Sequence, residues 1–227
     1  MQNQLKNEDF AILYRTNAQS RAMEDALRKR DIPYRIYGGL SFYQRKEVKD
    51  ILAYLRLVVN PKDEESLKRV INYPPRGIGQ TTVDKLVVAS KYHNLSLLET
   101  ANRAKELGVP VNVGTLTKLI NFSTLIKRFQ IENETLNAFE ITDLITKKIG
   151  LIQELKKDAT PEGIARIENI EELLNGIRDF TEGQIELADS SGNLAEFLED
   201  IALATDADKD DDPNNDRVAL MTIHLAK

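Results

Sequence analysis

The chain has 227 residues and a net charge of −5, with 41% hydrophobic and 30% charged residues, which is ordinary for a water-soluble protein with a core. It has no cysteine and only two histidines, so a disulfide framework and a thiolate zinc site are excluded and a histidine metal site is improbable. No apolar run approaches the roughly 18 residues that a membrane span needs, and the N-terminus has no signal-peptide pattern. We therefore expect a cytoplasmic protein with no membrane partner.

The charges are unevenly distributed along the chain. Residues 1–90 carry 16 Lys and Arg against 11 Asp and Glu, a balance of +5, whereas Asp206–Asp216 carries six Asp and one Lys, a balance of −5. Binding to a nucleic-acid backbone needs a local basic face and not a basic total. The distribution permits DNA contact near the N-terminus without establishing it.

The first 40 residues alternate strand and helix signals. Phe10–Tyr14 is an apolar run too short for a helix and predicts a buried strand, and Tyr34–Tyr37 predicts a second. Between them, Thr16 or Asn17 is expected to cap a helix that runs to about Arg30. Strand, helix and strand in this order predict a parallel sheet. The helix is expected to bury Ala18, Ala22, Met23, Ala26 and Leu27 and to pair Glu24 with Arg28 and Asp25 with Lys29 outside.

After Gly38-Gly39 the pattern becomes helical. Apolar spacing predicts a helix that ends before Asn60-Pro61, and Asp63 is expected to cap a short helix after it. Further helices are expected from Asn137 to Gly150, from Thr160-Pro161, and from Asn193 with Glu196.

The end of the chain returns to strand character. Asp206–Asp216 is charged and bears Pro and Asn, which predicts a linker, and Val218–Ile223 predicts a third strand. A strand needs a sheet, so the helical segment is interpreted as an insertion between strands of one sheet. The predicted fold class is α/β, with an incomplete parallel sheet interrupted by a large all-helical insertion. We expect the chain to be a piece of a larger protein.

The stretch Asn72–Lys85 is typical of a phosphate-binding hairpin. Two prolines lead to Gly77 and Gly79, which expose backbone N–H groups, and Thr81 or Thr82 is expected to cap the next helix. Amide donors at the positive end of a helix suit a phosphate, and Arg76 adds a charge. An ordinary glycine-rich turn between two helices is the alternative.

Several other polar residues have two interpretations. Arg15 and His224 each follow a predicted strand, where α/β sheets bind ligands, although a salt bridge for Arg15 and a structural role for His224 are alternatives. Arg45 and Lys46 begin an amphipathic helix, and their pattern does not decide between a functional and a solvated role. For Tyr37 and Tyr43 we favour packing over stacking on bases; His93 is interpreted as a surface or core histidine.

Four segments, in this order and at this spacing, resemble the UvrD/PcrA/Rep-type helicases of superfamily 1. Arg166–Glu172 is a further match, and the resemblance covers essentially the whole chain. The four segments are Ala11–Arg21, Tyr37–Asp50, Pro75–Gly79 and Leu220–Lys227.

The resemblance implies two RecA-like motor domains, each with a helical insertion, that translocate 3′ to 5′ on single-stranded DNA with ATP and Mg²⁺. It implies that residues 1–42 begin the second motor domain, that 43–212 form its insertion (subdomain 2B), and that 213–227 carry a return strand. No Gly-x-x-x-x-Gly-Lys-Ser/Thr segment occurs, so neither ATP, nor a metal, nor a catalytic residue is expected on this piece.

By position in the motifs, two groups of DNA-binding residues are implied. Arg15, Asn17, Thr222 and His224 resemble residues that contact single-stranded DNA. Arg76, Gly77, Ile78, Gly79 and Thr82 resemble the contact to the duplex at a junction. Ser41 stands where relatives often carry Lys or Arg, so no phosphate contact is assigned to it. The alternative class is a non-catalytic helix-hairpin-helix-like DNA-binding or protein-interaction module.

Overall fold

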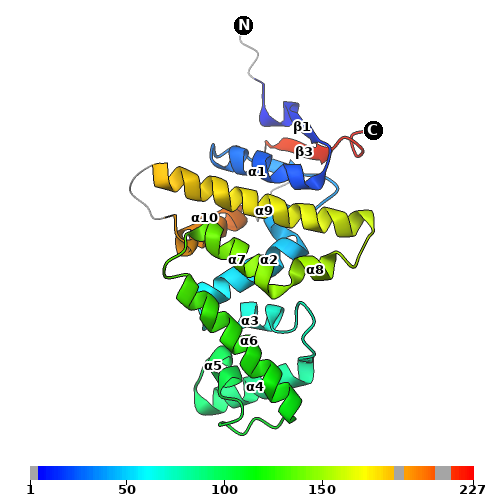
Figure 1. The fold of residues 1–227 in the computed structure, drawn as a ribbon. Helices are drawn as coiled ribbons and strands as arrows, with labels where there is room; N and C mark the ends of the chain where they lie inside the picture. The colour runs from blue at the N-terminus through cyan, green and yellow to red at the C-terminus, as the bar shows by residue number, and fades with distance from the viewer. Residues whose placement is uncertain (1–4, 187–191, 208–215) are drawn as a thin grey trace.

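The computed structural model describes residues 5–186, 192–207 and 216–227. A small sheet lies at one end of the molecule and helices extend away from it (Figure 1). Within the described residues, the helices all fall short of the length and apolarity needed to cross a membrane. The chain is mostly helical with a three-stranded parallel sheet, which is compatible with the expected α/β class.

The sheet contains the three predicted strands. They are β1 (Ala11–Tyr14), β2 (Tyr34–Ile36) and β3 (Val218–Thr222), all parallel, in the order β1-β3-β2. Ala11 is paired with Ala219 and Tyr34 with Val218. The last strand therefore fills the space between the first two, and the predicted parallel sheet is confirmed.

Helix α1 (Ser20–Arg28) covers the sheet after a turn of 3₁₀ helix at Asn17–Gln19. Its predicted apolar face is wrong in part, because Met23 and Ala22 are exposed while Leu27 is buried and Ala18 and Ala26 are half-buried. The residues that it buries are Ser20, Arg21, Glu24 and Leu27. Only Leu27 belongs to the sheet's small apolar cluster, with Tyr14, Val218 and Leu220. The polar members face other helices instead.

Within the described residues, nine further α-helices follow. They are α2 (Lys46–Val59), α3 (Glu64–Val70), α4 (Gln80–His93), α5 (Leu97–Asn102), α6 (Val113–Glu132), α7 (Ala138–Ile149), α8 (Leu151–Leu155), α9 (Pro161–Glu186) and α10 (Leu194–Ala207). One large apolar cluster, which begins at Phe42, joins these helices, and α2 contributes many of its fully buried side chains. In Figure 1, α9 crosses beneath α1 and the sheet, while α4 and α5 lie at the opposite end.

Local signals place most helix ends correctly. Asp63 accepts a hydrogen bond of 2.9 Å from the Ser66 backbone N–H, and Asn137 and Glu140 form a reciprocal capping box. Gly150 ends α7 with a φ of 78°, in the left-handed region that favours glycine. At α4, however, the N-cap is Gly79, so the prediction that Thr81 or Thr82 caps this helix is wrong. Most of the predicted linker Asp206–Asp216 lies outside the described residues.

Candidate nucleic-acid interface

One edge of the sheet forms a pocket of about 400 Å³. Arg15 and Asn17, which follow β1, line it together with Thr222 and His224 from the end of β3. Tyr14 is paired with Thr222, and the Ile223 N–H donates to the Tyr14 carbonyl at 2.9 Å. Because both parallel strands end at this edge, their following residues are brought together despite being some 200 positions apart.

The side chain of Gln19 holds the loop that contains Arg15. Gln19 Oε1 accepts hydrogen bonds from the backbone N–H groups of Arg15 at 2.9 Å and Thr16 at 3.3 Å. The Arg15 side chain is exposed and forms no ion pair with any residue that the structure describes, so the salt-bridge alternative finds no partner there. His224 is also exposed, in a turn closed by hydrogen bonds to the Thr222 carbonyl, and is therefore not a buried structural histidine.

The opposite side of the pocket comes from α9, which sequence reasoning did not associate with this site. Pro161, Ile164, Ala165 and Glu168 line it. Nothing in the spacing of these residues signals the contact, because α9 reaches the pocket only through tertiary packing. The nearest clue is Arg166–Glu172, which belongs to the resemblance.

The predicted hairpin is held by Asn72. Its Oδ1 accepts hydrogen bonds of 3.0 Å from the backbone N–H groups of both Arg76 and Ile78. Gly77, with a φ of +68°, permits the turn between them. The Ile78 side chain is buried in the helical core, so neither its side chain nor its N–H faces a ligand. The N–H groups of Gly77 and Gly79 have no acceptor among the described residues.

Arg76 does not project from the hairpin as expected. Its guanidinium donates to the carbonyls of Val70 at 3.0 Å and Pro74 at 3.2 Å and to the Tyr54 hydroxyl at 2.6 Å. It also lies over the Tyr54 and Phe122 rings. The motif pattern cannot give this orientation, which depends on α2 and α6. Arg76 is therefore a residue that fixes the hairpin from inside.

A second cation lies at the hairpin and was missed. Lys118 of α6 donates from Nζ to the Gly77 carbonyl at 3.3 Å and is otherwise exposed. It is 41 residues from Gly77, so only the folded chain brings it there. Thr82 lies in the first turn of α4 and is half-buried. The accessible groups of the hairpin thus include the two glycines and Lys118, with the half-buried Thr82 beside them.

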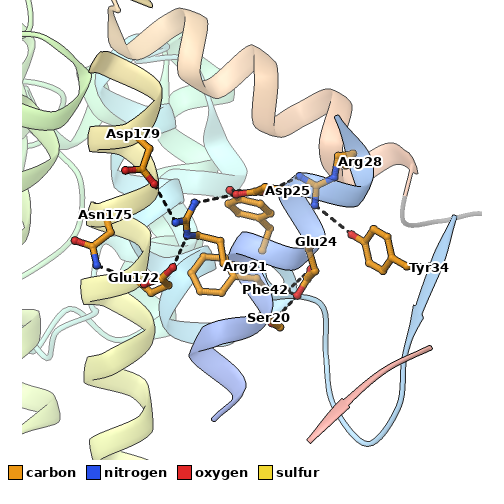
Figure 2. Close-up of polar contacts among 11 residues, drawn as sticks. Ser20, Arg21, Glu24, Asp25, Arg28, Tyr34, Phe42, Glu172, Asn175 and Asp179 are labelled. Carbon is orange, nitrogen blue, oxygen red and sulfur yellow. Dashed lines mark hydrogen bonds and ion pairs between the residues drawn. The ribbon is translucent and has the colours of Figure 1, made fainter. Parts of the chain in front are cut away.

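A polar junction joins α1 to the helices (Figure 2). Arg21 donates to Glu172 at 2.8 Å and Asp179 at 3.2 Å on α9, and to Asp25 on α1 at 2.9 Å. Glu24 accepts hydrogen bonds from the Ser20 hydroxyl and from the Phe42 backbone N–H. The predicted pair of Asp25 with Lys29 is wrong, because Asp25 forms ion pairs with Arg21 and Arg28.

The structure also places the other residues that had two interpretations, and one of them, Arg45, joins the same junction. Arg45 is buried and donates to Asn169 at 2.8 Å and to Ser20 at 2.7 Å, which makes it structural. Tyr43 is buried, as the packing interpretation predicts, whereas Tyr37 is 44% exposed and does not fit that interpretation. Lys46 is exposed beside Asp50. His93 lies exposed at the end of α4. The described part of the chain holds no cluster of three metal-ligating side chains.

A parallel sheet with polar residues gathered where its strands end, joined to a large helical part, is the arrangement of an α/β protein. The model of the UvrD-like helicase C-terminal domain matches residues 1–227, and the chain belongs to this family. It is 40% identical over 225 residues to proteins named ATP-dependent DNA helicase PcrA from Staphylococcus aureus strains Mu50 and NCTC 8325. It is 38% identical over 222 residues to that of Staphylococcus epidermidis strain RP62A.

These alignments cover 99% of this chain for S. aureus and 98% for S. epidermidis. In both cases the chain spans about 30% of the relative's length.

Proposed function

We propose that this chain is part of a cytoplasmic ATP-dependent DNA helicase that moves 3′ to 5′ along single strands. Membership of the UvrD-like family and the name of the PcrA relatives support this. Residues 1–42 and 213–227 would belong to the second motor domain and 43–212 to a 2B-type insertion. We propose that this chain is part of a polypeptide of the length of its PcrA relatives, called here the longer polypeptide. ATP and Mg²⁺ would be bound by that polypeptide, outside the residues of this chain.

The sheet-edge pocket is the observation that carries the proposal. Arg15 supplies a fixed charge, and Asn17, Thr222 and His224 supply amide, hydroxyl and imidazole groups around the same space. Such a set suits the phosphate and sugar of a single strand, which are bound without reading its sequence. Its place at the carboxyl edge of a parallel sheet is where α/β proteins bind ligands.

The hairpin is proposed to hold the duplex at a junction. Gly77 and Gly79 present N–H groups beside the positive end of α4, and Thr82 adds a hydroxyl. Arg76 and Ile78 act from inside by fixing the turn. The sheet, whose strand ends line the pocket, and α4, which follows the hairpin, lie at opposite ends of the molecule in Figure 1, so we treat the two DNA contacts as separable.

The proposal is tested in the longer polypeptide by measuring affinity for short single strands. Arg15→Ala should weaken binding by about three- to tenfold and lower the salt dependence by about one phosphate contact. His224→Ala should also weaken it, whereas His93→Ala, which changes the other exposed histidine, should not.

Equal effects of His224→Ala and His93→Ala would contradict the assignment of the pocket. Absence of ATP hydrolysis by the longer polypeptide, with or without single-stranded DNA, would favour the alternative, a DNA-binding module without a motor.

A further inference from the structure

The wall of the pocket formed by α9 differs chemically from the strand-end wall. Pro161, Ile164 and Ala165 present apolar surface, and Ile164 is 53% exposed although it lies beside polar groups. Glu168 lies one helical turn beyond Ile164 on the same face. The pocket thus has a polar strand-end side and a largely apolar helical side.

Opposite charges in this pocket do not neutralise each other. Arg15 and Glu168 both line it, yet neither forms an ion pair with any residue in the described ranges. Elsewhere on α9 the carboxylates of Glu172 and Asp179 are both engaged by Arg21. The half-buried Glu168 therefore keeps its acceptor oxygens available to a ligand.

A nucleotide of a single strand has the matching chemistry. Its phosphate is an anion, its base has a flat apolar face, and the edge of that base carries hydrogen-bonding groups. A carboxylate repels phosphate and accepts hydrogen bonds from amino groups. Arg15 would therefore attract the phosphate of a bound nucleotide, and Glu168 would attract the amino group on the edge of its base.

Resting on the proposed function, we propose that α9 forms the base-binding wall of the single-strand site. Pro161, Ile164 and Ala165 contact the face of a base, and Glu168 accepts a hydrogen bond from an amino group on its edge. The phosphate lies on the side of Arg15. Cytosine, adenine and guanine carry an exocyclic amino group and thymine does not, so the pocket disfavours thymine.

The test measures fluorescence anisotropy of the longer polypeptide with oligo(dC), oligo(dT) and an abasic oligonucleotide of equal length. Ile164→Ser should weaken binding to both base-bearing strands by about three- to tenfold and leave the abasic strand unchanged. Ile185→Ser is the matched control, because Ile185 lies near the other end of α9 and is similarly exposed at 57%. An equal loss on the abasic strand would overturn the base-binding role.

Glu168→Ala should reduce the preference for oligo(dC) over oligo(dT) by about threefold, with Glu171→Ala, an exposed neighbour outside the pocket, as its control. If Glu168 faced the phosphate, its removal would instead strengthen binding to all three strands, and the proposed orientation would be wrong.

Arg15→Ala distinguishes a failure of the proposed single-strand site from a failure of the base-binding wall alone. Arg15→Ala should weaken binding to every strand, including the abasic one, while Arg56→Ala on the exposed side of α2 should not. No effect of Arg15→Ala would overturn the proposed function itself. A clear effect of Arg15→Ala with none of Ile164→Ser would overturn only the base-binding wall.

Discussion

At the scale of single residues, Arg76 shows how burial changes the role of a charge. A guanidinium beside a glycine hairpin is typical of a phosphate contact, yet here it donates to Val70, Pro74 and Tyr54. A partly buried guanidinium needs acceptors, and the carbonyls of Val70 at the end of α3 and of Pro74 in the following turn supply them. Arg76 therefore fixes the shape of the hairpin from inside, and the backbone N–H groups of Gly77 and Gly79 are left exposed instead of its guanidinium.

The Tyr54 hydroxyl, which accepts a hydrogen bond from Arg76, leads to a prediction about stability at alkaline pH. Burial raises the pKa of Tyr54 to about 12, although Arg76 opposes the shift; Asp50 and Tyr73 also face it. An unfolded tyrosine ionises near pH 10, so the stability from the neutral phenol is complete below about pH 10 and is lost as the pH rises towards 12.

Between pH 8 and pH 11 the wild type should therefore lose about 1 kcal/mol more unfolding free energy than Tyr54→Phe, as measured by urea denaturation. Other tyrosines titrate in both proteins and cancel in the comparison. Parallel pH profiles for the two proteins would show that Tyr54 does not contribute.

At the scale of elements, α1 joins the sheet to α9. Its Leu27 packs on the sheet, while Arg21 reaches across to Glu172 and Asp179. Gly176 makes this approach possible, because a Cβ there would lie 2.6 Å from Arg21 Nη1. The two parts of the chain therefore meet through charged groups with defined partners and not through a continuous apolar surface.

Replacing Gly176 with Ala should test this junction. Alanine favours a helix by about 0.5–1 kcal/mol over glycine, but the added methyl group displaces Arg21 from its carboxylates, so a net loss of about 1 kcal/mol is expected in urea denaturation. Gly183→Ala on the same helix is the control, since among the described residues no atom beyond the adjoining helix backbone lies within 4 Å of the added Cβ, and the protein should become more stable. Stabilisation by both changes would contradict the close approach.

At the scale of the whole molecule, the sheet that carries the proposed single-strand contact and α4, which follows the proposed duplex contact, lie at opposite ends (Figure 1). Effects of mutations at two distant sites usually add without coupling. Substitutions at one end should then leave binding at the other end intact.

In the longer polypeptide, Gly79→Val should weaken binding to a forked duplex by about three- to tenfold, because the side chain would cover the exposed amides, and binding to single strands should be kept. A Cβ at Gly79 meets nothing within 4 Å and its φ of −79° is open to other residues, so the hairpin tolerates the change. His224→Ala should give the reverse pattern. Equal losses on both substrates would mean that Gly79 has a structural role only.

Much of the local structure was predictable from the sequence. The three strands, the caps at Asp63 and Asn137, and the glycine end at Gly150 depend on neighbouring residues, and those residues carry the information. The gathering of Arg15 and His224 was also predictable, because parallel strands share a carboxyl edge whatever lies between them. Their contact with DNA stays a prediction.

Only the tertiary structure placed β3 between β1 and β2, turned Arg76 inward, and brought α9 to the pocket. It also made the buried face of α1 polar, with Arg21 and Glu172 bonded across 151 positions. Helical periodicity reports apolar burial, whereas a buried charge is stable only when partners from distant segments satisfy it. Those partners are chosen by the packing of whole elements, and the spacing of residues within one element does not encode them.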